Sequence, residues 1–131
     1  MPEIKPKEWG REEWIVKNDH YTGKILHLKE GGQCSYHLHK KKTETLYILE
    51  GLVFMEYNGY FTPLGPGHSV TIKPETYHSF IGAVGSKILE FSTMHDSSDC
   101  YRDKKRLSCT LKREELNNIK KMAKRHWEDL I

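Results

Sequence analysis

Length, composition and charge restrict this chain to a small protein with one core. It has 131 residues, of which 37% are hydrophobic, and this content suits one modest core rather than two. Its 21 basic and 18 acidic residues give a net charge of +3 that is spread along the chain, without the basic patch of a nucleic-acid-binding protein. No apolar run approaches the roughly 18 residues that span a bilayer, and the first residues lack the apolar stretch of a secretory signal. We therefore expect a cytoplasmic protein with no nucleic-acid or membrane partner.

The strands of this chain are predicted from short β-rich segments that turn residues separate. Strands at such close spacing favour an antiparallel sandwich or barrel. Asn58-Gly59 lies between two apolar segments, as a two-residue type I′ hairpin turn requires. Residues 2–6, which include two prolines, are expected to form a polar lead-in. The expected strands cover residues 13–16, 23–28, 35–39, 45–49, 52–57, 60–63, 69–72, 78–83 and 87–93.

The last part of the chain predicts an amphipathic helix. From Thr110 onward, apolar residues recur at steps of three and four among charged and amide residues. Thr110 is the expected N-cap, and Glu114 and Glu115 lie where the helix dipole favours acidic residues. We expect residues 107–131 to pack on the outer wall of a barrel formed by residues 1–106, or on a partner subunit. The apolar stripe consists of Leu116, Ile119, Met122, Ala123, Trp127 and Leu130.

The three cysteines predict reduced thiols rather than a disulfide framework. Cys34, Cys100 and Cys109 cannot all pair within one chain, and they lack the CxxC spacing of a zinc knuckle. Cys34 precedes His37 by three residues, so on a regular strand its side chain would face away from that histidine. We therefore expect Cys34 to be neither a ligand nor a nucleophile.

Three histidines and one glutamate have the spacing of a metal site. His37 and His39 alternate on one strand, so they share a face on which two imidazole nitrogens can converge on one ion. Glu44 begins the next strand and supplies a carboxylate oxygen, and His78 could bring a third imidazole from a later strand. Three neutral imidazoles and one carboxylate leave open positions on a six-coordinate ion, which suits Mn²⁺, Fe²⁺, Zn²⁺, Ni²⁺ or Co²⁺. The sequence does not select among these metals.

The spacing of these ligands and of the glycines around them resembles the two-part signature of the cupin family. The resemblance implies an all-β, single-domain jelly-roll barrel, also called a double-stranded β-helix, with one divalent metal ion and the predicted helix at its C-terminus. Cupins often dimerise, so it also implies a homodimer. The signature residues are Gly31, His37, His39, Glu44 and Gly51 in the first part, and Gly67 and His78 in the second.

Over residues 6–102 the chain is also similar to the cupin domain of type II phosphomannose isomerases and related sugar isomerases. In those isomerases the position of His37 is usually glutamine, and the extra histidine is the arrangement of D-lyxose isomerase-like cupins. The resemblance implies a metal-dependent aldose–ketose isomerase, or an epimerase, acting on a sugar or sugar phosphate. It is carried by Trp9-Gly10, Tyr21, Lys24–Leu26, Ser35–His39, Glu44, Gly67–Ile72, Pro74, His78, Ile88–Glu90, Asp99 and Arg102.

The chemistry of such an isomerase points to candidate catalytic residues. Moving a proton between C1 and C2 through an enediol or enediolate needs an electrophile for the developing oxyanion and a base. The metal would supply the first, and Glu90, Lys42 and His95 are candidates for the second. Glu90 is preferred because it lies in the apolar segment 88–91, where an inward carboxylate would have a raised pKa. An outward, solvated Glu90 is the alternative.

Cations near the site would orient the substrate. We expect Lys24, Arg102 and His95 to contact the substrate and Lys42 to assist catalysis. Arg102 would contact a phosphate group if the sugar carries one, because a planar guanidinium suits bidentate anion recognition. A surface ion pair of Arg102 with Asp99 or Asp103 is the alternative.

Two other functions stay open at the level of sequence, because cupins host many chemistries. Three histidines, with or without Glu44, can bind Fe²⁺ and O₂, as a cupin dioxygenase requires. The chain could also be a non-catalytic module that binds a carbohydrate or another small ligand.

Overall fold

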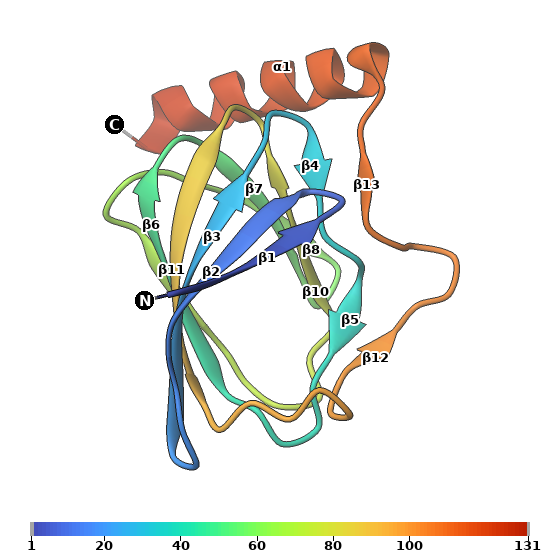
Figure 1. The fold of residues 1–131 in the computed structure, drawn as a ribbon. Coiled ribbons are helices and arrows are strands. Elements are labelled where there is room, and N and C mark those ends of the chain that lie inside the picture. The colour runs from blue at the N-terminus through green and yellow to red at the C-terminus, as the bar shows by residue number, and fades with distance from the viewer. Residues whose placement is uncertain (1, 131) are drawn as a thin grey trace.

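The computed structural model describes residues 2–130, except for the side chains of residue 123 and residues 126–130. Figure 1 shows a barrel of strands with one helix lying across one end, which confirms the all-β fold with a C-terminal helix. The elements are β1 (Glu3–Lys7), β2 (Gly10–Lys17), β3 (Tyr21–Leu28), β4 (Gly32–Gln33), β5 (His37–Leu38), β6 (Glu44–Glu50), β7 (Val53–Tyr57), β8 (Tyr60–Leu64), β9 (Ser69–Ile72), β10 (His78–Gly82), β11 (Ser86–Thr93), β12 (Tyr101–Arg102), β13 (Cys109–Thr110) and α1 (Arg113–Leu130).

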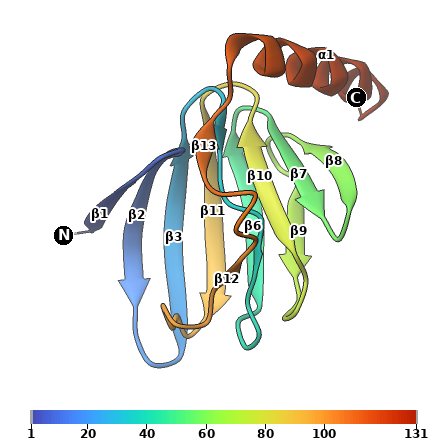
Figure 2. The same cartoon turned by 90° about the vertical axis from the view of Figure 1, so that its right-hand side faces the viewer.

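Two antiparallel sheets form the barrel wall. The first has the strand order β1-β2-β3-β11-β6-β9. The second has the order β12-β5-β10-β4-β13, and β7 joins it by pairing with both β10 and β8. Figure 2 shows the segment from β12 to β13 running along one side of the barrel up to α1. Residues far apart in sequence, such as those of β5, β10 and β12, are thereby brought side by side.

Alternation of side chains on β3, β6 and β11 divides the barrel interior into two layers. Ile88 of β11 lies between Leu26 and Ile48 in the strand register, and these three residues form an apolar layer. Two positions along β11, Glu90 pairs with Lys24, which begins a polar layer. Ile88 is fully buried, and burying a side chain of this size contributes about 1.5–3 kcal/mol to stability.

Helix α1 lies across the end of the barrel that carries the β3–β4 turn (Figure 1). Lys120 Nζ is 3.0 Å from Oε2 of Glu30, which lies in that turn. On the apolar face, Leu116 is buried and Ile119 packs against the pair formed by Phe54 and Ile81. Part of the predicted stripe therefore covers one end of the barrel, while Met122 remains 43% exposed. The predicted contacts of Ala123, Trp127 and Leu130 lie outside the described side chains.

The start of the helix differs from the prediction. Thr110 is not the N-cap, because it belongs to β13 and pairs with Gly32. The helix begins at Arg113, where the Glu115 carboxylate accepts a hydrogen bond of 3.2 Å from the backbone N–H of Lys112. This is the backward half of a capping box. Across residues 2–130 no helix combines the length and apolar character that crossing a bilayer requires.

Two stretches of backbone also differ from the expected strands. The lead-in forms strand β1, and Pro6 pairs with Arg11 within it. Proline is tolerated there because β1 is the edge of its sheet and leaves one side unpaired. The strand expected over residues 35–39 is interrupted, since residues 34–36 lie between β4 and β5. The hairpin turn is confirmed, with φ of 48° at Asn58 and 84° at Gly59.

Candidate metal centre and its cavity

Three histidine side chains meet inside the barrel. One nitrogen from each ring of His37, His39 and His78 lies within 4.8 Å of the other two. His37 of β5 and His78 of β10 are direct partners in the sheet, and His39 follows the end of β5. His39 and His78 are buried, and His37 is partly buried.

Backbone carbonyl groups fix the orientation of all three rings. A carbonyl oxygen only accepts hydrogen bonds, so each neutral ring must carry its proton on Nδ1. The lone pair of Nε2 is then available to a metal ion, and the carbonyl partner holds the ring in place. The Nδ1–H groups donate from His37 to Ser35 (2.7 Å), from His39 to Asp99 (2.6 Å) and from His78 to Thr76 (2.9 Å).

Glu44 lies beside the three histidines, and its close contact with His78 requires a positive charge between the two side chains. Its Oε1 atom is 2.8 Å from Nε2 of His78 and 3.7 Å from Nε2 of His39. Because the neutral His78 ring has its proton on Nδ1, two acceptor atoms would face each other at 2.8 Å. A metal ion, or a second proton on the ring, satisfies both atoms. Three imidazole nitrogens and a carboxylate oxygen therefore fit a divalent transition metal.

Burial and nearby charges favour the ionisation states that bind metals. Burial, helped by the charge of His78, lowers the pKa of His37 to about 3, and burial also lowers the pKa of His39. Burial alone would raise the pKa of Glu44. When His78 carries a second proton, its hydrogen bond to Glu44 and the charge of Lys42 outweigh burial and hold the pKa of Glu44 well below its ordinary value. Neutral imidazoles and an ionised carboxylate are the forms that coordinate metal ions.

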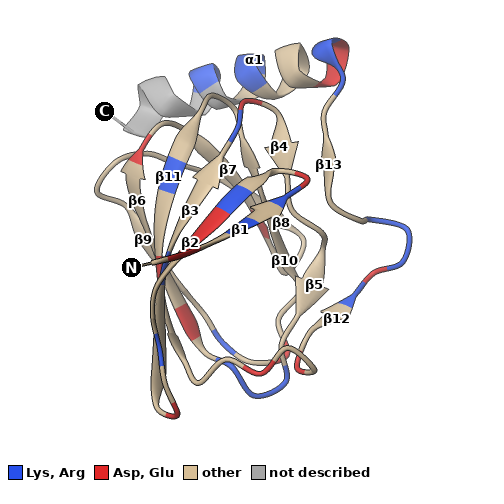
Figure 3. Ribbon diagram, in the orientation of Figure 1, with Lys and Arg blue, Asp and Glu red and all other residues tan. Residues whose placement is uncertain are grey.

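The histidine cluster lines a polar cavity of about 260 Å³. The β1–β2 hairpin, on which both basic and acidic residues lie (Figure 3), forms part of its wall. Trp9, Leu26 and Phe80 add an apolar surface. The charged residues around the cavity are Lys5, Lys7, Lys24, Lys42, Arg102, Glu12, Glu44 and Glu90.

A chain of alternating charges crosses this cavity from the metal cluster. Lys42 Nζ lies 3.5 Å from Glu44 Oε2 and 3.7 Å from Glu90 Oε2. Lys24 Nζ lies 3.6 Å from the same oxygen of Glu90 and 3.7 Å from Glu12 Oε2. Each buried charge thus has a neighbour of opposite sign, as ions removed from water require.

Glu90 points into the barrel. Its residue is 6% exposed, and its Oε2 atom has no hydrogen-bond partner among the residues that the structure describes. Burial and then the charge of Glu44 raise the pKa of Glu90, and the lysines at 42 and 24 oppose this rise without cancelling it. A buried carboxylate with a raised pKa in the wall of a cavity is a candidate general base.

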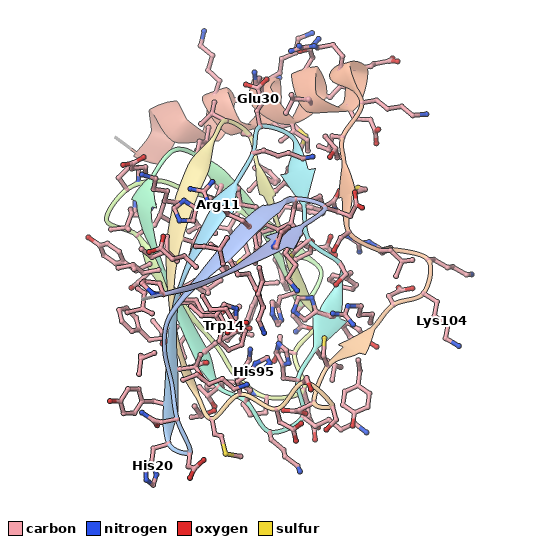
Figure 4. The ribbon with its side chains drawn as sticks, viewed as in Figure 1. Arg11, Trp14, His20, Glu30, His95 and Lys104 are labelled. Carbon is pink, nitrogen blue, oxygen red and sulfur yellow. The ribbon has the colours of Figure 1, made fainter. Side chains whose placement is uncertain are left out.

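His95 and Arg102 also line the cavity. The ring of His95 packs edge-on against Trp14 with 4.9 Å between centroids, and Figure 4 shows both labelled residues inside the barrel. Burial and then the charge of Lys24 lower the pKa of His95 to about 4, and its Nδ1 has no partner within the described residues. Arg102 of β12 is opposite His37 in register. No ion pair of Arg102 with Asp99 or Asp103 is present in the described part of the chain.

A family model described as "Cupin domain" matches residues 24–95, a stretch that includes the three histidines, Glu44 and Glu90. The chain belongs to the cupin family. No curated protein sequence matches this cupin significantly.

Solved structures agree with the cupin fold at low sequence identity. KdgF from Halomonas sp. is 15% identical with a TM-score of 0.68, over 73% of this chain and 89% of that one. Pac13, described as a unique nucleoside dehydratase, is 14% identical with a TM-score of 0.70, over 81% and 86%. A variant of oxalate decarboxylase from Bacillus subtilis is 15% identical with a TM-score of 0.69, over 77% of this chain and 30% of that one. These structural similarities establish the cupin fold. They provide no evidence for the sugar isomerase families that the sequence resembles.

Asp99 organises the site of this cupin in a way that the sequence analysis missed. Its carboxylate accepts hydrogen bonds from the backbone N–H groups of Lys40, Lys41 and Lys42, at 2.8–3.3 Å, and its carbonyl accepts from His39. The turn held in this way exposes Lys40 and Lys41 and buries Lys42. Nothing in sequence spacing indicates these contacts, because they join residues 57 to 60 positions apart.

Replacing Asp99 with alanine should destabilise the fold by about 2–3 kcal/mol, since three N–H groups lose a charged acceptor. Metal affinity should also fall, because the turn next to His39 loosens. Denaturant unfolding and metal titration measure the two effects. Asp96→Ala is the matched control, since among the described residues the Asp96 carboxylate accepts hydrogen bonds from Ser98 of its own loop alone. Equal losses in the two variants would contradict this role.

The prediction that Cys34 faces away from the histidines is wrong. Its side chain lines the same cavity, because residues 34–36 leave the regular strand and alternation no longer sets their direction. Its Sγ atom accepts a hydrogen bond of 3.3 Å from the backbone N–H of Phe80. Burial raises the pKa of Cys34 to about 12, so it remains a thiol at neutral pH and acts as a packing residue, as expected.

Proposed function

We propose that this cupin is a metal-dependent enzyme that removes a proton from a carbon next to a carbonyl group of a sugar or sugar phosphate. An aldose–ketose isomerase returns the proton to the neighbouring carbon, and an epimerase returns it to the same carbon with inversion. One observation carries the proposal. Glu90 places a buried carboxylate in the wall of the cavity into which three histidines present their Nε2 atoms. Abstraction of a proton next to a carbonyl group needs both a base and a cationic site for the developing oxyanion.

His37, His39, His78 and Glu44 would hold one divalent transition metal ion, and Mn²⁺, Fe²⁺, Zn²⁺, Ni²⁺ and Co²⁺ all suit this ligand set. When bound, the ion would supply a Lewis acid beside the substrate oxygens. The position of Glu44 between His78 and Lys42 keeps its carboxylate ionised for this purpose.

Glu90 would carry the proton in this reaction. In the isomerase reaction its carboxylate would accept the proton from C2 of the aldose and return it to C1 while the hydroxyl proton passes from O2 to O1, so the step is redox-neutral overall. A raised pKa makes Glu90 a stronger base than a solvated glutamate. Lys42 and Lys24, at 3.7 and 3.6 Å from Oε2, hold the carboxylate in place. Lys42 would also donate a hydrogen bond to a substrate oxygen.

The rest of the cavity suits a small polar ligand. Its volume of about 260 Å³ lies below the roughly 300–1,000 Å³ of pockets for drug-sized ligands, which favours a molecule the size of one monosaccharide. His95 offers a neutral imidazole that can hydrogen-bond to a hydroxyl group. Trp14, which lines the same cavity, offers an aromatic surface to C–H groups of a sugar.

Proton exchange in heavy water tests the proposal. Metal-loaded protein should replace a C–H proton of its substrate with deuterium in D₂O under strict anaerobiosis, and ¹H NMR across aldoses, ketoses and their phosphates detects the loss of that signal. Exchange should stop when the metal is removed. Turnover that requires oxygen would contradict the proposal and favour a dioxygenase. A sugar that raises the melting temperature but shows no exchange would favour a binding module.

A further inference from the structure

The cavity is lined by more lysine and arginine side chains than carboxylates. Each of the three carboxylates that line it lies within 3.7 Å of a lysine that also lines it. Two further cations, Lys5 and Arg102, have no carboxylate partner from the cavity. The internal pairs are Lys7–Glu12 (3.7 Å), Lys24–Glu90 (3.6 Å) and Lys42–Glu44 (3.5 Å).

Lys5 reaches the cavity from the edge strand β1. Its Nζ atom lies 4.3 Å from the centroid of the Trp14 ring, which also lines the cavity. Within the described residues its ion pair is with Glu3, at 4.0 Å, and the Glu3 side chain is 68% exposed. Water screens a pair of this kind, so it neutralises little of the charge of Lys5.

Arg102 lines the cavity from β12, which is an edge strand of the second sheet. It is the direct register partner of His37, so the two side chains lie on one face, with about 4.5–5.5 Å between their Cβ atoms. A guanidinium presents a planar fork of N–H donors that matches a carboxylate or a phosphate. In the part of the chain that the structure describes, no hydrogen bond or ion pair occupies this fork. Figure 3 shows basic residues on both β1 and β12.

We propose that the substrate of this cupin is an anion, and that Arg102 and Lys5 recognise its phosphate or carboxylate group. The inference rests on the proposed function only in taking this cavity as the substrate site. Arg102 is exposed and the Lys5 side chain is 40% exposed, so water solvates both cations before a ligand binds. A neutral sugar would displace part of that water without supplying a counter-charge, and a bound divalent ion would add to the positive charge. An anionic group beside Arg102 and Lys5 supplies the counter-charge and gains charge-assisted hydrogen bonds.

Binding measurements test this preference without any turnover. Zn²⁺-loaded protein is titrated by calorimetry with D-glucitol, D-gluconate and D-glucitol 6-phosphate, which share one polyol chain and differ in carrying no charge, a carboxylate or a phosphate. At least one anionic polyol should bind about tenfold or more tightly than D-glucitol, as charge-assisted hydrogen bonds predict. The tighter of the two anionic polyols identifies the group that the site recognises.

Matched variants assign the preference to the two cations. Arg102→Gln and Lys5→Gln should each reduce it several-fold, and Arg102→Lys should restore part of the loss because it keeps the charge without the fork. Lys104→Gln is the control, since Lys104 is exposed and points away from the barrel in the segment that follows β12 (Figure 4). Metal content is measured in every variant, so that loss of the ion is not mistaken for loss of the anion contact.

Three results would overturn the inference: equal affinity for the three polyols, no measurable binding of either anionic polyol, or a preference that survives both Arg102→Gln and Lys5→Gln. The calorimetric titration measures binding and needs no turnover, so none of these three results would contradict the proton exchange that the proposed function predicts. Conversely, a protein that exchanges no proton can still show the anion preference, and the two proposals can fail separately.

Discussion

Glu90→Gln is expected to lower the rate of metal-dependent proton exchange by about 10²- to 10⁴-fold, the contribution typical of a positioned general base. Glutamine keeps the shape of the side chain but cannot accept the proton. The metal should stay bound, because the proposed ligands are His37, His39, His78 and Glu44 and do not include Glu90. Exchange is followed by ¹H NMR in D₂O, and metal content by elemental analysis of the same sample.

Glu13→Gln is the matched control for this change. Glu13 is the same residue type on β2 of the same sheet, but it contacts His27 at 3.0 Å and does not line the cavity. This variant should exchange protons at the rate of the unmodified protein. Thermal melting of both variants separates loss of the base from loss of the fold. A Glu90→Gln protein that exchanges protons at the normal rate would show that Glu90 is not the base.

The pH dependence of exchange gives a second signature of Glu90. A protonated carboxyl group cannot accept a proton, so the rate should fall as pH drops through the pKa of Glu90. Because burial and the charge of Glu44 raise that pKa, the acid limb should lie above the range of a solvated glutamate. The logarithm of the rate plotted against pH measures it. A limb in the ordinary glutamate range would indicate a solvated base instead.

His39→Ala should abolish stoichiometric metal binding while the barrel stays folded. The variant loses one of the three converging nitrogens, and its neighbour Glu44 loses a contact at 3.7 Å. Removing a ligand should cost more than the 10–100-fold in affinity that is typical of an outer-shell partner. Elemental analysis and metal titration measure the loss, and circular dichroism follows the fold.

His27→Ala is the control for the loss of an imidazole. His27 is partly buried on β3, its Nε2 atom contacts Glu13, and it does not line the cavity. Its replacement should leave metal content unchanged. A bound metal should also stabilise the folded state of the unmodified protein, so chelation should lower its melting temperature and should have little effect on His39→Ala. Equal metal content in His39→Ala and the unmodified protein would exclude His39 as a ligand.

The convergence of the three histidines could be predicted because it depends on local rules. Alternation on a strand places His37 and His39 on one face. The position of His78 was expected from the resemblance to the cupin signature, and the structure pairs its strand with β5. The same rule turned Glu90 inward, since Ile88 and Glu90 share a face of β11. Residues on regular strands were therefore placed well by sequence alone.

Contacts that depend on loops and long-range pairing could not be predicted. Asp99 reaches back to a turn 57 or more positions earlier, and Cys34 turned toward the cavity where its strand is interrupted. The position of Glu12 in the cavity wall was not predicted. It lies beside Lys24 because β2 pairs with β3, and this pairing has a register shift between Trp14 and Val16. The domain boundary at residue 106, the homodimer and the cytoplasmic location stay predictions.

The metal centre is the claim on which the functional account depends, and anomalous diffraction tests it most directly. Crystals of protein purified with added Mn²⁺, Fe²⁺, Zn²⁺, Ni²⁺ or Co²⁺ would be measured at the absorption edge of the ion that elemental analysis finds. If these residues hold the ion, the map should show one strong peak about 2.0–2.2 Å from the Nε2 atoms of His37, His39 and His78. A peak bound elsewhere on the chain, or protein that retains none of these ions, would contradict it.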